Sequence, residues 1–309
     1  MNLDLNNLIK ENLPKQTQGK VASYIPALAE VNPNQLGVAL YDLKNKEIIQ
    51  AGDSDVRFAI ESISKVITLL WAIKKLGMQE VFTHVGSRQT GFAFNSILNM
   101  EINKLKHPMN PFVNAGAIMT TSLIVEDKKR DPEPFAEILD FAQEICNDPD
   151  LYLDDVIYHS ERRTGNLDRS LAYYMKSKNM MIAEVEPSLD TYFEQCSMMV
   201  TAKSLANLGA VLANDGIKPW DGERLISSES ATYTKSLMMT TGLYNQSGTY
   251  SRLIGVPTKS GVGGGLVSAA PHEYGIGVFS PALDKEGNSV AGLGLLQDIV
   301  DGLGLDIFK

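Results

Sequence analysis

The chain has 309 residues, of which 44% are hydrophobic and 21% are charged, and its formal net charge at pH 7 is −9. This composition is typical of a soluble globular protein. The negative charge argues against nucleic acid or an anionic membrane surface as a partner. At this length we expect one large unit or two interlocked ones.

Cys146 and Cys196 are the only cysteines, and each has apolar neighbours in the sequence. Two isolated cysteines of this kind indicate reduced core residues, not a disulfide framework. The N-terminus has no basic start followed by an apolar core, which argues against a secretory signal. No apolar run approaches the length of a membrane span. We therefore expect a cytoplasmic protein.

In chain order, the first elements predicted are two strands, 36–42 and 47–50, which form a hairpin. A helix over 62–77 follows, with apolar residues at helical spacing and Gly77 as its stop. Residues 79–112 are mixed and loop-rich. The chain then becomes helical, with Thr201 and Ser228 as expected N-caps; the predicted helices cover 114–126, 134–147, 168–178, 201–214 and 228–239.

Strand patterns return near the C-terminus, over 257–262, 265–270 and 274–280, before a final helix over 289–303. Strands at both ends of the chain predict one antiparallel sheet built from the N- and C-terminal segments, with flanking helices and an inserted helical domain. This is an α+β layout, not the alternating order of a doubly wound fold. We treat 1–309 as a single unit in which about 1–61 and 240–309 hold the sheet and about 62–239 are mainly helical.

Several chemistries do not fit the sequence. The four histidines are scattered singly, so a zinc site is improbable and a Ser-His-Asp triad has no obvious candidate. The glycine-rich residues 261–265 follow Lys259 and Ser260 instead of preceding a Lys-Ser/Thr pair and a helix. They therefore match neither a phosphate loop nor a dinucleotide fingerprint. We expect neither a metal nor an organic cofactor.

Ser62 and Lys65 form a Ser-x-x-Lys pattern at the start of the predicted helix 62–77. Residues three apart share a helix face, so both side chains can point into one cleft. A buried lysine with a lowered pKa can remove the proton from a serine hydroxyl and make it nucleophilic. The tetrapeptide alone also occurs by chance in many proteins.

Lys259-Ser260-Gly261 is a second signal, because Ser-x-x-Lys acyl-transfer enzymes carry a Lys-Thr/Ser-Gly strand opposite the nucleophile. The N–H groups of Val262 and Ser62 would then form an oxyanion hole. Taken alone, Lys-Ser-Gly is more often a turn at the end of a strand.

The chain also carries longer strings, namely V-A-S-Y-I-P-A-L (21–28), E-S-I-S-K (61–65), N-P-F-V-N-A-G-A-I (110–118), Y-F-E-Q-C-S (192–197), G-L-Y-N-Q-S-G (242–248), K-S-G-V-G-G-G (259–265) and P-A-L-D-K-E-G-N-S (281–289). In these strings it resembles the serine-dependent glutaminase family of the β-lactamase/transpeptidase-like fold. The resemblance runs from Val21 to Leu295. At residue 61 the chain has Glu where the family usually has Gln.

The resemblance implies hydrolysis of L-glutamine to L-glutamate and ammonia through a γ-glutamyl ester of Ser62. Lys65 would be the general base, and Tyr244 would relay a proton to the leaving ammonia. Substrate contacts fall on Ser62 and Tyr244 themselves and on Tyr24, Asn114, Glu161, Asp168, Tyr192 and Val262. Without the motifs, the tyrosines could equally be core residues and Asn114 a helix cap.

Asp168 departs from the family, which has a substrate-binding Asn at that position. A carboxylate beside the α-carboxylate of the substrate would repel it unless Asp168 is protonated or paired, for instance by Arg169. Asn166 is an alternative donor if the loop shifts. The departure concerns affinity and substrate choice, not the nucleophile.

Three hypotheses from different classes follow. The first is a cytoplasmic glutaminase that is a homodimer or homotetramer by analogy with the family. The second is another Ser-x-x-Lys hydrolase, acting on β-lactams or D-alanyl peptides. The third is a catalytically weak relative that binds an amino acid in the same pocket.

Overall fold

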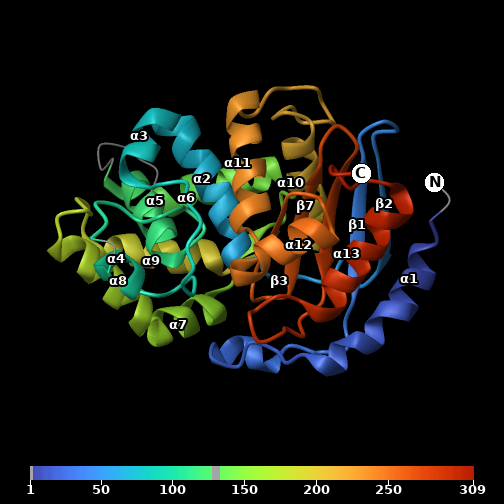
Figure 1. Ribbon diagram of the computed structural model, residues 1–309, viewed down its shortest axis with the longest axis horizontal. Coiled ribbons are helices and arrows are strands. Elements are labelled where there is room, and N and C mark those ends of the chain that lie inside the picture. Colours follow the sequence, from blue (N-terminus) through green and yellow to red (C-terminus); the bar gives the residue numbers. More distant parts are fainter. Residues whose placement is uncertain (1–2, 103, 127–132) are drawn as a thin grey trace.

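A computed structural model describes residues 3–102, 104–126 and 133–309 (Figure 1). The main sheet contains β1 (Gly37–Asp42), β2 (Glu47–Gly52), β6 (Thr258–Ser260), β7 (Gly265–Ala270) and β8 (Tyr274–Phe279). Its strand order is β2-β1-β8-β7-β6, and every neighbouring pair is antiparallel. β1 and β8 come from opposite ends of the chain and pair along their whole length. The predicted α+β fold, with its sheet built from both ends, is confirmed.

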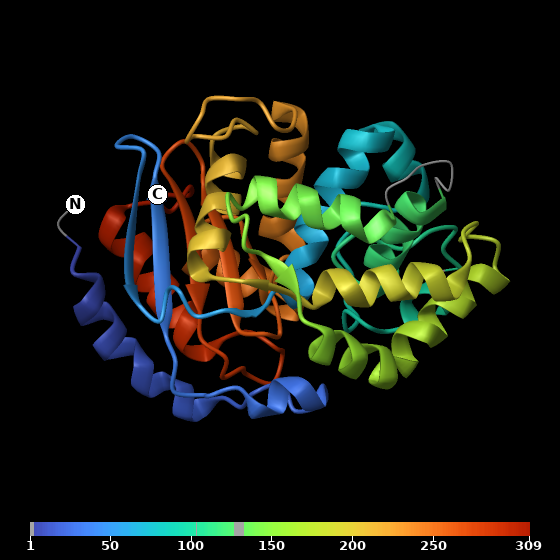
Figure 2. The same ribbon diagram turned by 180° about the vertical axis from the view of Figure 1, so that it is seen from behind.

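Helices cover both faces of this sheet. On one face α1 (Leu5–Asn12) and α13 (Val290–Leu303) pack over a core that includes Val38 and Leu40 of β1. On the other face α10 (Ala202–Ala213) lies against β1, β7 and β8, in a core that includes Ala39 and Tyr41 (Figures 1 and 2). Because both faces are covered, β1 reads as a continuous apolar run and not as an alternating one.

A second, smaller sheet links the Ser62 segment to the middle of the chain. It consists of β3 (Phe58–Ala59), β5 (Met198–Val200) and β4 (Tyr152–Leu153), in the order β3-β5-β4. The Ile60 N–H also donates to the Met198 carbonyl at 2.8 Å. These contacts fix the backbone immediately before Ser62.

The helical part is built around α5 (Asn114–Glu126). Residues 114–125 are all buried, which explains why this helix has no polar face in the sequence. The helices that contact it include α2 (Ser64–Leu76), α3 (Met78–His84), α8 (Asn166–Ser177) and α9 (Val185–Cys196). The remaining helices are α4 (Leu98–Ile102), α6 (Pro134–Ile145), α7 (Asp155–Thr164), α11 (Ser228–Thr241), α12 (Ser247–Leu253) and the 3-10 turns η1 (Leu13–Gln18), η2 (Pro26–Glu30), η3 (Glu61–Ile63) and η4 (Tyr244–Gln246).

Some local predictions were incomplete or wrong. The helices α1, α7, α9 and α12 were not predicted, and the stretch expected to be loop-rich, 79–112, contains most of α3 and all of α4. α7 is largely polar, so it lacks a strong apolar pattern, although its N-cap Asp154 is a typical start signal. Thr201 is an N-cap with a full capping box, as predicted. The cap of α11 is Ser227 instead of Ser228.

Candidate active site

Ser62 lies in η3, immediately before α2, and its side chain lines a cavity of about 320 Å³. The preceding residue, Glu61, has φ +51°, a conformation that few non-glycine residues adopt. This sharp turn after β3 presents Ser62 at the cavity wall. The predicted continuous helix over 62–77 therefore begins as a 3-10 turn and becomes an α-helix at Ser64.

The structure brings most of the predicted site residues into this one cavity, although they come from six separate parts of the chain. Its lining includes Tyr24, Ser62, Asn114, Glu161, Asp168, Tyr192 and Val262. Tyr24 stands at the rim with 61% of its surface exposed, whereas Tyr192 is buried. Two predicted residues lie beside the cavity instead of lining it, namely Lys65 and Tyr244.

Lys65 is fully buried on the α5 side of the cavity. Its Nζ donates to Asn114 Oδ1 at 2.7 Å and to the Phe112 carbonyl at 3.5 Å. Burial lowers the pKa of Lys65, and the nearby carboxyl groups of Asp168, Glu61 and Glu161 only partly oppose this effect. The shift favours a neutral amine, which is the form that can accept a proton from a hydroxyl group.

Asn114 links Lys65 to Asp168. Its Oδ1 accepts from Lys65, and its Nδ2 donates to Asp168 Oδ1 at 2.8 Å. Arg169, the predicted partner of Asp168, instead lies 3.6 Å from Glu186 and donates to the Arg162 carbonyl. Asn166 is exposed at the start of α8, whereas Asp168 lines the cavity. Of these two residues, Asp168 is therefore the one placed to contact a bound substrate.

Three carboxyl groups meet at the Asp168 side of the cavity, from Glu61, Glu161 and Asp168. Burial raises the pKa of Glu161 to about 7, and the charge of Asp168 adds to the shift. Burial and the adjacent Glu161 raise the pKa of Glu61 well above its usual value, and burial also raises the pKa of Asp168. Glu61 was not among the predicted site residues. Its place directly before the nucleophile was the signal that could have identified it.

Val262 follows β6 and places its backbone beside the Ser62 turn. A Cβ at Gly263 would lie 2.1 Å from the Ala59 carbonyl oxygen, so only glycine allows the loop to approach β3 this closely. Within the described part of the chain, the Val262 N–H makes no hydrogen bond. It is therefore available to an oxyanion.

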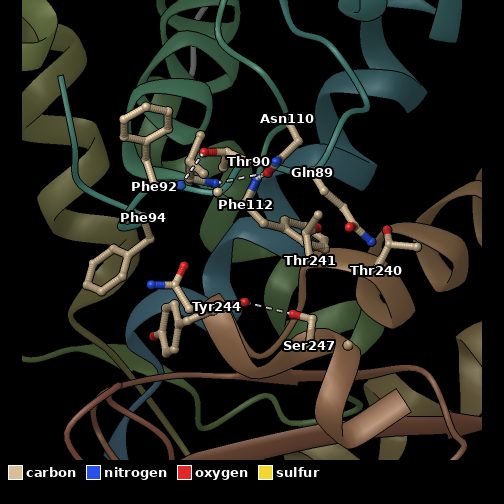
Figure 3. Close-up of a pocket in the computed structure, with 14 residues that line it drawn as sticks. Gln89, Thr90, Phe92, Phe94, Asn110, Phe112, Thr240, Thr241, Tyr244 and Ser247 are labelled. Atoms are coloured by element: carbon tan, nitrogen blue, oxygen red, sulfur yellow. Dashed lines mark hydrogen bonds between the residues drawn. The ribbon is translucent and has the colours of Figure 1, made fainter. Parts of the chain in front are cut away.

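Tyr244 lines a neighbouring cavity. Its ring packs at a tilt of 39° against Phe94, with 4.7 Å between ring centroids, and Phe94 lines both cavities. The Lys259 Nζ lies 4.7 Å from the Tyr244 ring centroid. Figure 3 shows Phe94 and Tyr244 side by side at the edge of the second cavity, whose lining also includes Thr240 and Thr241. Burial raises the pKa of the Tyr244 phenol.

Among the described residues, no group of three or more His, Cys, Asp or Glu side chains is arranged to hold a metal ion. The two cysteines are buried and unpaired, as predicted. Of the helices in the described ranges, none combines the length and the apolar character needed to cross a bilayer.

Comparison with known proteins identifies the family of the chain. The model of the glutaminase family matches residues 19–308. The chain belongs to the glutaminase family. Glutaminase 1 of Clostridium perfringens is 57% identical over 309 residues, covering all of both chains.

Solved structures agree with this assignment. A probable glutaminase has a TM-score of 0.91 and 36% identity, over 99% of this chain and all of that one. A probable glutaminase from Bacillus subtilis, complexed with 6-diazo-5-oxo-L-norleucine, has a TM-score of 0.88 and 33% identity over 98% of this chain and 95% of that one. The enzyme has the β-lactamase-like fold and hydrolyses L-glutamine to L-glutamate and ammonia. The other two hypotheses, a β-lactam or D-alanyl peptide hydrolase and a non-catalytic binding relative, are set aside.

Proposed function

We propose that glutamine is hydrolysed in the Ser62 cavity through a γ-glutamyl ester of Ser62, with Lys65 as general base. The observation that carries this proposal is the position of Ser62 in a cavity that Asn114, Glu161 and Tyr192 also line. Lys65 is buried next to Asn114, and burial lowers its pKa. In the free enzyme the Lys65 amine donates to Asn114 Oδ1. To act as the base, this amine turns from Asn114 toward Ser62 Oγ once glutamine is bound.

In the first step Ser62 Oγ attacks the side-chain carboxamide carbon, and its proton passes to the neutral Lys65 amine. The N–H groups of Ser62 and Val262 donate to the oxyanion that forms. The C–N bond then breaks while the leaving nitrogen takes a proton from Tyr244, which recovers one from the Lys65 ammonium. Ammonia and the γ-glutamyl ester are the products, and Lys65 is neutral again.

In the second step a water molecule attacks the ester carbonyl and gives a proton to Lys65. The bond to Ser62 Oγ breaks, Ser62 regains its proton, and L-glutamate leaves. Because the same base and oxyanion hole serve both steps, no metal or organic cofactor is required.

The amino-acid end of glutamine occupies the other side of the cavity. We assign Glu161 to the α-ammonium group, with which an ionised carboxylate forms a charge-assisted hydrogen bond. Tyr24, Asn114 and Tyr192 supply amide and phenol donors for the α-carboxylate. Asp168 contributes no donor when it is ionised, and its charge opposes the α-carboxylate.

The experiment is ammonia release from L-glutamine, L-asparagine and γ-glutamyl analogues by wild-type enzyme and by Ser62→Ala. We expect release from glutamine by the wild type and a loss of at least about 10³-fold in kcat in Ser62→Ala. Ser64→Ala is the matched control, because Ser64 belongs to the same motif and its hydroxyl contacts Cys196 Sγ at 3.8 Å, but Ser64 does not line the cavity and has no part in the proposed chemistry. Equal release by Ser62→Ala and the wild type would refute the mechanism.

We also propose a homodimer or homotetramer and a cytoplasmic location. The assembly rests on the family resemblance. The location is supported by two free, buried cysteines, as is usual in a reducing compartment. Light scattering at the assay concentration tests the assembly.

A further inference from the structure

The hydroxyl group of Tyr244 is buried and faces two serine side chains. The hydroxyls of Ser62 and Ser260 lie beside it, but within the described ranges it makes no hydrogen bond. A phenol that must deliver a proton to one atom needs a defined orientation. Neighbouring groups must therefore hold this hydroxyl in place beside Ser62.

Ser260, at the end of β6, has its own hydrogen committed elsewhere. Its hydroxyl donates to Asn288 Oδ1 at 2.6 Å, and both residues are fully buried. The orientation of the Asn288 amide is settled by its other contacts, because Nδ2 donates to the Leu243 carbonyl at 3.2 Å and to Gln246 Oε1 at 2.6 Å. A carbonyl can only accept, so Oδ1 must be the atom that faces Ser260.

Asn288 is itself held by a tight turn over residues 284–288. Asp284 Oδ1 accepts from the backbone N–H groups of Glu286 at 2.8 Å and Asn288 at 3.0 Å, and the Asp284 N–H donates to the Asn288 carbonyl at 2.8 Å. This turn belongs to the motif P-A-L-D-K-E-G-N-S, to which the reaction assigns no role.

The segment that carries Tyr244 is anchored by the same Asn288. Leu243 and Gln246 flank Tyr244, and both accept from Asn288 Nδ2. Tyr244 has φ +52°, which is unusual for an aromatic residue and needs support from its surroundings. Ser247 adds to this support, since its hydroxyl donates to the Tyr244 carbonyl at 2.9 Å (Figure 3).

We propose that the buried pair Ser260–Asn288 positions the Tyr244 hydroxyl for proton delivery to the leaving group. Ser260 holds Oδ1 of the Asn288 amide, and Nδ2 of the same amide holds Leu243 and Gln246 on either side of Tyr244. The pair therefore fixes the backbone that carries the phenol, and with it the place of the hydroxyl beside Ser62. Ser260 and Asn288 are positioning residues, because they act through Tyr244. The inference rests on the proposed role of Tyr244.

The test compares three serine variants in steady-state glutamine hydrolysis. Ser260→Ala removes the hydroxyl that donates to Asn288 Oδ1, and Ser260→Thr retains a hydroxyl group at the same position. Ser280→Ala is the matched control, because Ser280 is also a fully buried serine near the end of a sheet strand, and its hydroxyl has no hydrogen-bond partner in the described residues.

We expect Ser260→Ala to lower kcat roughly 10- to 100-fold with KM within about twofold of wild type. Ser260→Thr should recover most of the kcat, and Ser280→Ala should be unchanged. An unchanged kcat in Ser260→Ala, an equal loss in Ser280→Ala, or a loss in Ser260→Thr as large as in Ser260→Ala would overturn the proposal. Failure of the proposed mechanism looks different, because Ser62→Ala would then release ammonia as fast as the wild type.

Discussion

Asn114 donates to Asp168 at 2.8 Å while it accepts from Lys65 at 2.7 Å. The amide side chain of Asn114 thus joins the candidate general base, Lys65, to the carboxyl group of Asp168, where the family resemblance leads us to expect an Asn. In the free enzyme, the donors that would serve the α-carboxylate of glutamine are partly occupied by Asp168. This contact predicts a cost in substrate affinity.

Asp168→Asn should therefore lower KM for glutamine about threefold to tenfold, since it removes a like charge beside the α-carboxylate. Burial raises the pKa of Asp168, so the charge develops only as the pH rises. The difference in KM between variant and wild type should accordingly be larger at pH 8 than at pH 6. Asp190→Asn, at a surface ion pair with Arg162, is the control. An unchanged or higher KM in Asp168→Asn would contradict the prediction.

Lys65→Arg should lower kcat about 10²- to 10⁴-fold, because a guanidinium group stays protonated and cannot accept the Ser62 proton. Arginine can still donate a hydrogen bond to Asn114. If Lys65 had only a structural role, the variant would therefore keep most of its activity. Lys235→Arg is a matched control, because Lys235 is another buried lysine, paired with Asp215 at 3.1 Å and outside the cavity. Steady-state kinetics of ammonia release measure both.

Glu61→Gln should raise the melting temperature at pH 8 more than at pH 5. Burial and Glu161 raise the pKa of Glu61 in the folded state, so the folded protein keeps this proton to a higher pH than the unfolded chain. The contribution of Glu61 to the free energy of unfolding is therefore largest below the ordinary carboxyl pKa. It is lost as the pH rises toward the folded-state pKa of Glu61. Gln cannot ionise and escapes this loss.

The expected gain of Glu61→Gln at pH 8 is roughly 2–4 °C, measured by thermal unfolding at both pH values. Glu229→Gln, at an exposed position in α11, should show no such difference between the two pH values. A gain of the same size at pH 5 and pH 8 would show that Glu61 is not a buried, destabilising acid.

Gly116→Ala should lower the melting temperature by at least about 3 °C. Gly116 lies in α5, in the string N-P-F-V-N-A-G-A-I, and a Cβ there would lie 1.8 Å from the Asn110 carbonyl oxygen. The backbone would have to move apart at the point where α5 begins and Asn114 is placed. Gly248→Ala in α12 is the control, since its Cβ meets nothing within 4 Å; a decrease as large as that of Gly116→Ala would contradict the steric explanation.

Local patterns in the sequence were sufficient for the secondary structure that depends on neighbouring residues. The strands 37–42 and 265–270, the helix after Ser62 and the cap at Thr201 all follow from residues within one or two turns. The α+β fold followed because strand patterns occur at both ends of the chain. The polar helix α7 was missed because burial of its few apolar residues depends on distant partners.

The sequence by itself determined the family, and it predicted the Ser62 and Lys65 pair and several residues that line the cavity, although it missed Glu61. Only the tertiary structure decided their environments. Lys65 and Asn114 are 49 residues apart, and Asn114 and Asp168 are 54 apart. Whether Asp168 pairs with Arg169 or with Asn114 depends on how α5 and α8 pack. The carboxyl pKa values likewise depend on burial, and burial is a property of the whole fold, not of any one segment.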